Sequence, residues 1–134
     1  MRRVLATLGA IVVLAAGCSG SGRATLAVYT SVTQATVDAV VAGFREANPD
    51  VEVEVLRAPT GELNARIAAE RREGGLRADV LWLTDPLSMQ QYDADGLLRG
   101  ADPDVSGIPA AYREDRFWGT RILNLVVVTG DGVV

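Results

Sequence analysis

The fold is decided by the stretch Ala27-Val28-Tyr29-Thr30-Ser31-Val32-Thr33-Gln34, in which a strand ends and a helix begins. Apolar residues alternate up to Val28, and from Val37 they recur three and four positions apart, the spacing of a helix face. A helix that begins at the carboxyl end of a strand directs its free N–H groups and its positive dipole end toward that turn. The turn is therefore a favourable place for an anionic or polar ligand.

Two interpretations of the hydroxyl groups in this turn stay open. Thr30, Ser31 and Thr33 can contact a ligand. Alternatively, Ser31 can cap the helix, because Ser31-Val32-Thr33-Gln34 fits the capping box in which the glutamine side chain reaches back to the cap. The motif by itself favours capping.

Strand and helix patterns alternate through the following residues. Strands are predicted over 24–30, 51–56 and 78–83, and helices over 33–47, 61–73 and 86–94. The third strand is apolar on both faces, which is typical of a parallel strand buried between helices. A long irregular connection over 99–116 leads to a strongly apolar strand over 120–128. This order predicts an α/β protein with a mostly parallel sheet and helices on both faces.

Three of these strands end in turns that carry a hydroxyl beside a helix start. In open α/β sheets, ligands bind outside the carboxyl ends of the strands. We therefore expect one ligand site lined by Thr30, Ser31, Thr33, Thr60, Gly61, Thr84 and Asp85. Besides Ser31, two of these residues have a capping interpretation, because Thr60 is placed to cap the second helix and Asp85 precedes a proline at the start of the third. For Asp85, capping is favoured over ligand contact.

Composition excludes several classes of function. Nearly half of the 134 residues (49%) are hydrophobic, enough for about one folded domain. Histidine is absent, which removes Ser-His-Asp catalysis and histidine metal sites. A formal net charge of −4 offers no basic face for a nucleic acid. No nucleophile is paired with a base and no cluster of metal ligands is visible, so an enzyme is disfavoured and no cofactor or bound metal is predicted.

The N-terminus resembles the signal peptide of bacterial lipoproteins. A positive start, Met1-Arg2-Arg3, precedes a run of fourteen uncharged residues, shorter than the roughly twenty that span a membrane. Leu14-Ala15-Ala16-Gly17 then precedes the only cysteine, Cys18, as in a lipobox with alanine in the usual leucine place. The resemblance implies a signal peptide over 1–17, a lipid-modified Cys18 and a flexible tether over 18–23, with anchoring to the outer face of the cell membrane. The alternative, an unpaired thiol in a secreted protein, is less favoured.

Several sequence blocks, in their order and spacing, resemble the first lobe of bacterial extracellular solute-binding proteins of ABC importers. The similar branch includes ferric-ion-, phosphonate- and thiamine-binding proteins. The blocks are Val28-Tyr29-Thr30-Ser31, Phe44-Arg45-Glu46-Ala47-Asn48-Pro49, Thr60-Gly61-Glu62-Leu63, Ala78-Asp79-Val80-Leu81-Trp82, Asp85-Pro86-Leu87-Ser88-Met89, Gly96-Leu97-Leu98 and Gly119-Thr120-Arg121-Ile122-Leu123-Asn124. This resemblance implies a type II periplasmic-binding-protein-like fold, in which two lobes enclose the ligand.

By this resemblance, the chain is a lipid-anchored solute receptor that delivers a small-molecule or ion ligand to an ABC permease. Residues 24–134 correspond to an incomplete first lobe, truncated near the hinge strand Leu123 to Val128, and the second lobe is absent. A half-site cannot enclose its ligand, so a truncated, non-transporting surface lipoprotein or gene remnant is the alternative.

The resemblance leaves the ligand open between iron and an anionic or organic solute. Ferric-binding relatives can use a histidine in the first turn and a glutamate after the third strand, places that fall on Thr33 and near Thr84. Neutral hydroxyls are poor ligands for ferric ion, which prefers anionic oxygen. Hydroxyls beside helix N-termini suit a phosphonate, phosphate ester or carboxylate better, and the sequence therefore favours such a solute.

Overall fold

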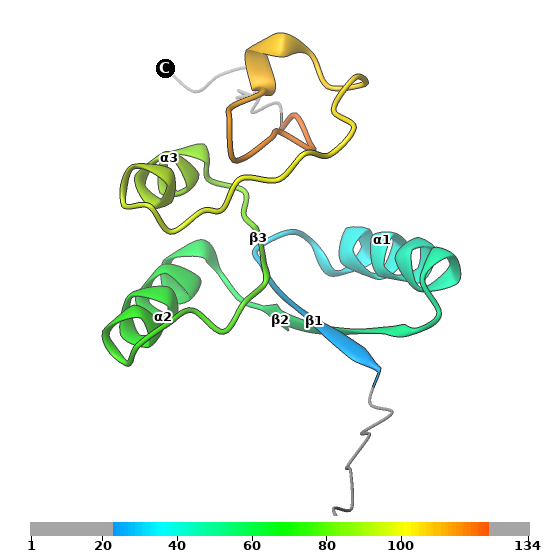
Figure 1. Ribbon diagram of the computed structural model, residues 1–134, viewed down its shortest axis with the longest axis horizontal. Helices are drawn as coiled ribbons and strands as arrows, with labels where there is room; N and C mark the ends of the chain where they lie inside the picture. The colour runs from blue at the N-terminus through cyan, green and yellow to red at the C-terminus, as the bar shows by residue number, and fades with distance from the viewer. Residues whose placement is uncertain (1–22, 124–134) are drawn as a thin grey trace, which may run out of the picture.

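A computed structural model describes residues 23–123 and shows a three-stranded sheet flanked by helices (Figure 1). In chain order the elements are β1 (Ala24–Thr30), α1 (Gln34–Ala47), β2 (Val51–Arg57), α2 (Thr60–Arg72), β3 (Val80–Trp82), α3 (Pro86–Ala94) and the 3₁₀ helix η1 (Ala110–Tyr112). The alternation of strands and helices through α3 confirms the order predicted from the sequence. The irregular connection after α3 is also confirmed, with only η1 and one isolated bridge, Arg113 to Trp118, inside it.

The strand order is β2-β1-β3, and both pairings are parallel. The register aligns Thr30 at the end of β1 with Arg57 on one side and Trp82 on the other. Because the strands are parallel, the turns that follow them all leave the sheet at this one edge. We call it the carboxyl edge.

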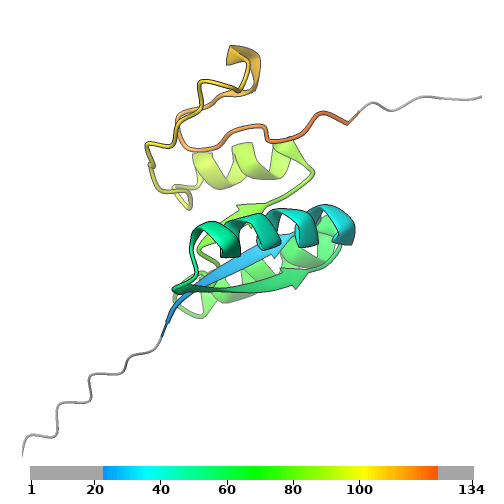
Figure 2. The same ribbon diagram turned by 90° about the vertical axis from the view of Figure 1, so that its right-hand side faces the viewer.

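Helices cover both faces of the sheet. Figures 1 and 2 show α1 on one side of β1 and β2, with α2 on the other side and α3 beyond β3. Successive residues of β1 point to opposite faces, so Tyr29 packs into a buried cluster with Leu63, Ile67 and Tyr92 from α2 and α3. Val28, its neighbour in β1, is buried on the α1 side. The core therefore has two parts, one on each face of β1.

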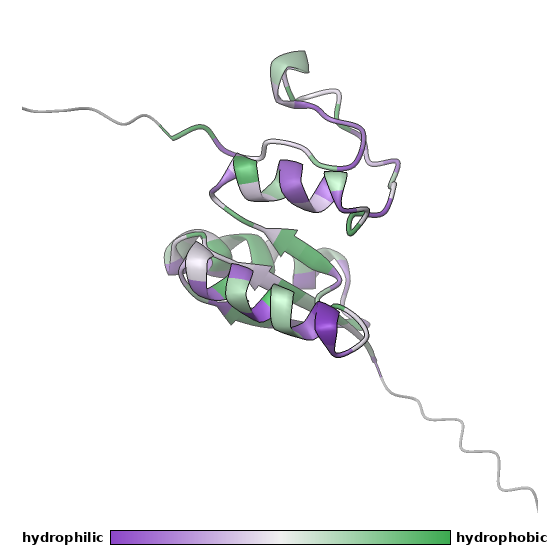
Figure 3. Cartoon of the chain, turned by 90° about the vertical axis from the view of Figure 1, so that its left-hand side faces the viewer, coloured by the Kyte–Doolittle hydropathy of each residue, from purple (hydrophilic) through white to green (hydrophobic). Residues whose placement is uncertain are grey.

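The third strand is shorter and more exposed than its sequence suggests. We expected a strand over 78–83 buried on both faces, but β3 contains only Val80–Trp82 and Val80 is 39% exposed. In Figure 3 most of β3 has the colour of hydrophobic residues. Its exposure follows from its position, because within the described residues β3 pairs with β1 on one side only and α1 lies over the other two strands.

Of the strand predicted over 120–128, the structure describes residues 120–123, and these form no strand. Thr120 to Leu123 are irregular, and Ile122 and Leu123 are 63% and 57% exposed. The remainder of that prediction, the signal peptide over 1–17, Cys18 and all of the tether except Arg23 lie outside the described residues. Between residues 23 and 123, no helix has the length and apolar character needed to cross a membrane.

Candidate functional site

The turn after β1 is held in place by the buried hydroxyl of Thr30. This residue is 0% exposed. Its Oγ1 donates to the Trp82 carbonyl at 2.8 Å and accepts from the Val32 N–H at 3.1 Å. The Ala58 N–H donates in turn to the Thr30 carbonyl at 3.1 Å. Thr30 thus joins the ends of all three strands. Direct ligand contact by Thr30 stays a prediction, and its burial argues for a positioning role instead.

Three hydroxyls from three different turns meet at the carboxyl edge. Ser31 Oγ lies 3.1 Å from Thr84 Oγ1, and Thr60 Oγ1 lies 3.5 Å from the same atom. Ser31 Oγ also accepts from the Thr84 N–H at 2.9 Å. Thr84 is exposed, while Ser31 and Thr60 are half-buried. We call these residues the hydroxyl cluster; it presents rotatable O–H groups, which both donate and accept, to solvent.

The capping box predicted for α1 is wrong. The N-cap of α1 is Thr33, and no side chain caps the helix. Ser31 lies too early in the chain to cap it and is bonded to Thr84 instead. Gln34 does not reach back but donates forward to Asp38 at 2.8 Å, and the Thr33 hydroxyl pairs with that of Thr36 at 3.0 Å. Thr33 follows Ser31 by two residues in the chain. It is exposed, and its side chain does not cap α1.

The capping role expected for Thr60 is also wrong. Thr60 is the first residue of α2, Pro59 occupies the N-cap, and no side chain caps this helix either. Gly61 follows in the exposed first turn, where an added Cβ would meet no other atom within 4 Å. Consequently, α1 and α2 both begin at the carboxyl edge without a side-chain partner for their first N–H groups. Uncapped helix starts favour polar or anionic groups through these donors and the helix dipole.

Asp85 caps α3, as the sequence favoured. Its carboxylate accepts from the Leu87 N–H at 3.1 Å, from the Ser88 N–H at 3.2 Å and from Ser88 Oγ at 2.6 Å. The hydrogen bond from the Ser88 hydroxyl, followed by those from the two backbone groups, outweighs partial burial and lowers the pKa of Asp85. The carboxylate is therefore ionised at neutral pH and directed at its own helix.

A polar relay fixes α3 against α2 behind these turns. Tyr92 donates from its hydroxyl to Asn64 Oδ1 at 2.7 Å, and Asn64 Nδ2 donates to Ser88 Oγ at 2.9 Å. Ser88 Oγ in turn donates to the carboxylate of Asp85. Since Asn64 belongs to α2 and the other residues to the start and body of α3, the relay sets how closely the Thr60 and Thr84 turns approach.

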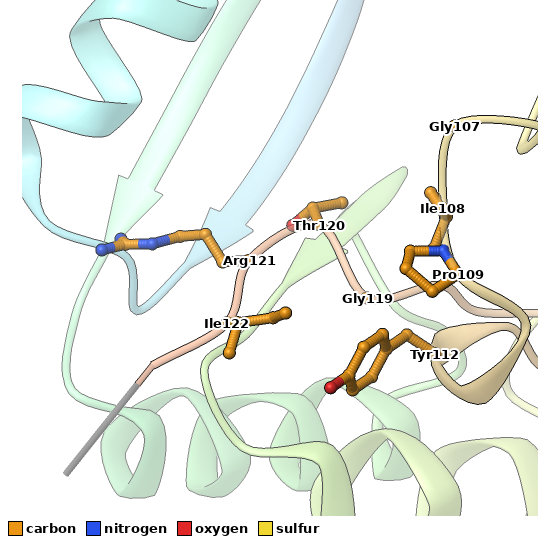
Figure 4. A pocket seen from close by; sticks show the side chains of 8 residues that line it. All are labelled: Gly107, Ile108, Pro109, Tyr112, Gly119, Thr120, Arg121 and Ile122. Atoms are coloured by element: carbon orange, nitrogen blue, oxygen red, sulfur yellow. The ribbon is translucent and has the colours of Figure 1, made fainter.

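Sequence reasoning missed two arginines near this edge. Arg57, the last residue of β2, is exposed, and its Nε donates to the Val32 carbonyl at 2.8 Å. Arg121 follows Thr120, whose hydroxyl accepts from Trp82 Nε1 at 2.9 Å. In Figure 4 the Arg121 side chain extends toward the ends of β1 and β2. The available signal for Arg57 was a basic residue closing the otherwise acidic and apolar strand Val51–Arg57.

An open groove of about 340 Å³ adjoins the segment that carries Arg121. Its walls come from residues 107–109, Tyr112 and residues 119–122, and Figure 4 shows the Tyr112 ring facing Ile122. The walls approach closely at Gly119, where an added Cβ would lie 3.0 Å from Tyr112 Cβ. Nowhere in residues 23–123 do three or more carboxylate, thiol or imidazole groups gather as a metal site would require.

Residues 25–114 match the family described as bacterial extracellular solute-binding protein. The chain belongs to this family. A solved structure, the substrate binding protein of the ABC transporter from Agrobacterium tumefaciens, is 28% identical to the chain with a TM-score of 0.63. The match covers 74% of this chain but only 29% of that one, so the chain spans less than a third of that relative's length. Among curated proteins, none matches significantly.

This membership agrees with the fold and with the class of function expected from the sequence. The parallel sheet and its flanking helices match a periplasmic-binding-protein-like lobe. The family and the structural relative consist of substrate-binding proteins rather than enzymes, which fits a chain without histidine. In this solute-binding family context, the carboxyl edge with its hydroxyl cluster is the candidate ligand site.

Proposed function

We propose that the chain forms the first lobe of an ABC-importer solute receptor and that the hydroxyl cluster is its half of the solute site. The observation that carries this proposal is that the hydroxyls of Ser31 and Thr60 lie 3.1 and 3.5 Å from the hydroxyl of Thr84. Three turns that are far apart in sequence supply polar groups to one exposed edge. Such convergence at the carboxyl ends of parallel strands is typical of ligand sites in α/β proteins.

We further propose that a second lobe, encoded beyond residue 134, closes over this edge and completes the site. The chain's limited span of its structural relative, 29%, supports this division. In this proposal residues 1–17 are a signal peptide, Cys18 carries the lipid anchor, residues 18–23 are a tether and residues 24–134 are the incomplete first lobe. The anchored receptor would then hand its solute to permease subunits in the same membrane.

The proposed solute carries an anionic group on an organic body, for example a phosphonate. Hydroxyls and uncapped helix starts supply hydrogen-bond donors to such a group. The nearby carboxylate of Asp85 is bonded to α3 and is not presented as a metal ligand. Iron(III) is the alternative, with its anionic ligands supplied by the second lobe.

The experiment is solute binding by the full-length product of the gene, measured by thermal shift and calorimetry. Ferric citrate, 2-aminoethylphosphonate and thiamine are the first probes. Thr84→Val removes the central hydroxyl without changing side-chain shape, and one neutral hydrogen bond corresponds to about a 2- to 10-fold loss of affinity. Thr33→Val is expected to weaken binding if that exposed hydroxyl contacts solute. Thr25→Val, exposed at the opposite end of β1, is the matched control.

Two outcomes would contradict parts of this proposal. Equal affinity of the Thr84→Val and Thr25→Val proteins would remove the hydroxyl cluster from the solute site. Stabilisation by ferric ion alone would replace the anionic solute with iron.

The lipid anchor has its own test. Mass spectrometry of the mature N-terminus is expected to find a diacylglyceryl group on Cys18, and an unmodified thiol there would refute anchoring. The downstream DNA separates a receptor from a gene remnant: a continuing frame followed by permease and ATPase genes supports the receptor.

A further inference from the structure

We infer that Arg57 is the residue of this half-site that recognises the anionic group of the solute. The inference rests on the proposed function and deepens it, because it assigns the charge of the solute to one side chain. It predicts that the solute carries a carboxylate, phosphonate or phosphate.

The backbone places Arg57 at the carboxyl edge. Arg57 ends β2 directly beside Thr30, in the register that also aligns Trp82 with Thr30. Its Nε donates to the Val32 carbonyl at 2.8 Å, which fixes the guanidinium against the turn that carries Ser31. The start of α2 follows three residues later at Thr60. The side chain is therefore held between the first two of the three turns.

The charge of Arg57 is not neutralised by the described part of the chain. Four other arginines pair with carboxylates: Arg66 with Glu70, Arg71 with Asp95, Arg77 with Glu73 and Arg116 with Asp93. Within the described residues, Arg57 forms no such pair, and neither do Arg45 and Arg121. Between residues 23 and 123, no carboxylate lies within ion-pair distance of Arg57. An arginine that is oriented by a backbone carbonyl and left without a counterion keeps its full charge for an external anion.

The guanidinium group has enough N–H donors to bind both the Val32 carbonyl and an external anion. Binding the Val32 carbonyl uses Nε, and the N–H groups on the two terminal nitrogens have no acceptor within the described residues. A planar guanidinium can offer such groups in pairs to carboxylate or phosphonate oxygens. A lysine ammonium lacks this fixed fork, so Arg57→Lys retains the charge while losing the geometry.

Two helix starts at this edge favour an anion, against the exposed carboxylate of Glu62 in the first turn of α2. α1 and α2 both point uncapped N-termini toward this edge. The carboxylate of Asp85, which would repel an anion, accepts hydrogen bonds from Ser88 and the start of α3. Enclosure by a second lobe would lower the local dielectric and strengthen the interaction further.

The test compares Arg57 with a chemically matched arginine in the full-length protein. Arg45, in the last turn of α1, is also exposed and also donates to a backbone carbonyl, that of Val53 at 3.0 Å. It lies away from the carboxyl edge. Arg57→Gln, Arg57→Lys, Arg45→Gln and Arg45→Lys are titrated calorimetrically with inorganic phosphate, 2-aminoethylphosphonate and thiamine monophosphate, and with the unphosphorylated solutes thiamine and glucose.

The expected result is binding of an anionic probe that Arg57→Gln weakens about 10- to 100-fold, the range for a hydrogen bond to a charged group. Arg57→Lys is expected to weaken binding of the anionic probe less than Arg57→Gln does, because lysine keeps the positive charge. Both Arg45 variants should bind as the unmodified protein does. The loss at Arg57 should also shrink at high salt, because counterions screen an exposed charge pair.

Several results would overturn the inference. Equal anion affinity in the Arg57→Gln and Arg45→Gln proteins would remove Arg57 from recognition and leave the proposed function standing. Binding of thiamine or glucose but of no anionic probe would also remove Arg57 from recognition; it would leave the receptor proposal standing and refute the anionic solute. An equal loss of affinity for anionic and non-anionic solutes would show that Arg57 only holds the turn. Failure of the unmodified protein to bind any probe would count against the proposed function as well.

Discussion

Replacing the buried carboxylate of Glu70 with an amide should destabilise the lobe and change how its stability depends on pH. Glu70 is only 4% exposed, on the face of α2 that packs on the sheet. One carboxylate oxygen accepts from the Tyr29 hydroxyl at 2.7 Å and from Arg66 Nε at 2.9 Å, and the other accepts from the Arg77 N–H at 3.0 Å. The carboxylate thus links β1, α2 and the segment that leads into β3.

The magnitude follows from these hydrogen bonds. In Glu70→Gln the amide oxygen still accepts from Tyr29, but the amide N–H₂ faces the Arg77 N–H, so one hydrogen bond is lost. A bond to a charged acceptor contributes about 1.5–3 kcal/mol, and weakening of the bond from Tyr29 to neutral strength removes about 1 kcal/mol more. The ion pair with Arg66 adds little to this sum because Arg66 is exposed and solvent screens its charge. We expect the free energy of unfolding to fall by about 2.5–4 kcal/mol.

The pH dependence has a definite sign. Burial raises the pKa of Glu70, but the hydrogen bonds from Tyr29, Arg77 and Arg66 outweigh burial, and the pKa lies below its ordinary value of 4.5. A carboxyl group whose pKa is lowered by folding contributes stability above its unfolded pKa and loses it as the pH falls through the folded pKa. The gap between the unmodified protein and Glu70→Gln should therefore be full at neutral pH and should shrink below pH 4.5.

The assay is urea unfolding of the full-length protein, followed by far-UV circular dichroism at neutral and acidic pH. Glu73→Gln is the control, because Glu73 lies on the same segment and pairs with Arg77 at 3.3 Å but is 65% exposed. It should change the unfolding midpoint little. A Glu70→Gln loss no larger than that of the control, or a gap independent of pH, would refute the reasoning.

Three further substitutions test the core, a cap and a turn in the same unfolding assay. Ile67→Ala, at a side chain that is 0% exposed, should lower the free energy of unfolding by about 2–5 kcal/mol, whereas Val40→Ala at a half-exposed position should have a small effect. Asp85→Ala removes the cap of α3 and should lower the free energy of unfolding by about 1 kcal/mol at neutral pH. This loss should decrease in acid because the pKa of Asp85 is lowered in the folded protein. A loss that instead grows in acid would contradict the capping role. Gly96→Ala should lower the free energy of unfolding by about 1 kcal/mol because Gly96 has a φ of +69°. Gly100→Ala should not, because an added Cβ at Gly100 meets no other atom and its φ is not in the left-handed region.

The helices and strands were predictable because their signals are local. The alternation of Val51–Arg57 and the change of period after Val28 need only a few neighbouring residues to be recognised. The Asp85 cap was predictable for the same reason, since its partners lie two and three residues away. The exposure of β3 was not predictable, because an apolar strand looks the same at the edge of a sheet as at its centre.

The candidate site was predictable as a set of turns and not as a set of contacts. Parallel strand order was enough to expect hydroxyl-bearing turns at one edge. The capping box failed because Ser31 found a partner 53 residues away, Thr84, that no local motif describes. Arg57 was missed because its role depends on the Val32 carbonyl, brought close by the pairing of β1 with β2.

The sequence by itself determined where strands end, where helices begin and that three hydroxyl-bearing turns follow parallel strands. Only the tertiary structure decided that no hydroxyl of these turns caps its helix, which hydroxyls meet one another and which charge has no counterion among the described residues. The physical reason is that backbone preferences act over a few residues, whereas a polar side chain takes whichever partner the folded chain brings within about 3 Å of it. Ser31, with a helix start nearby in sequence and Thr84 nearby in space, bonded to Thr84.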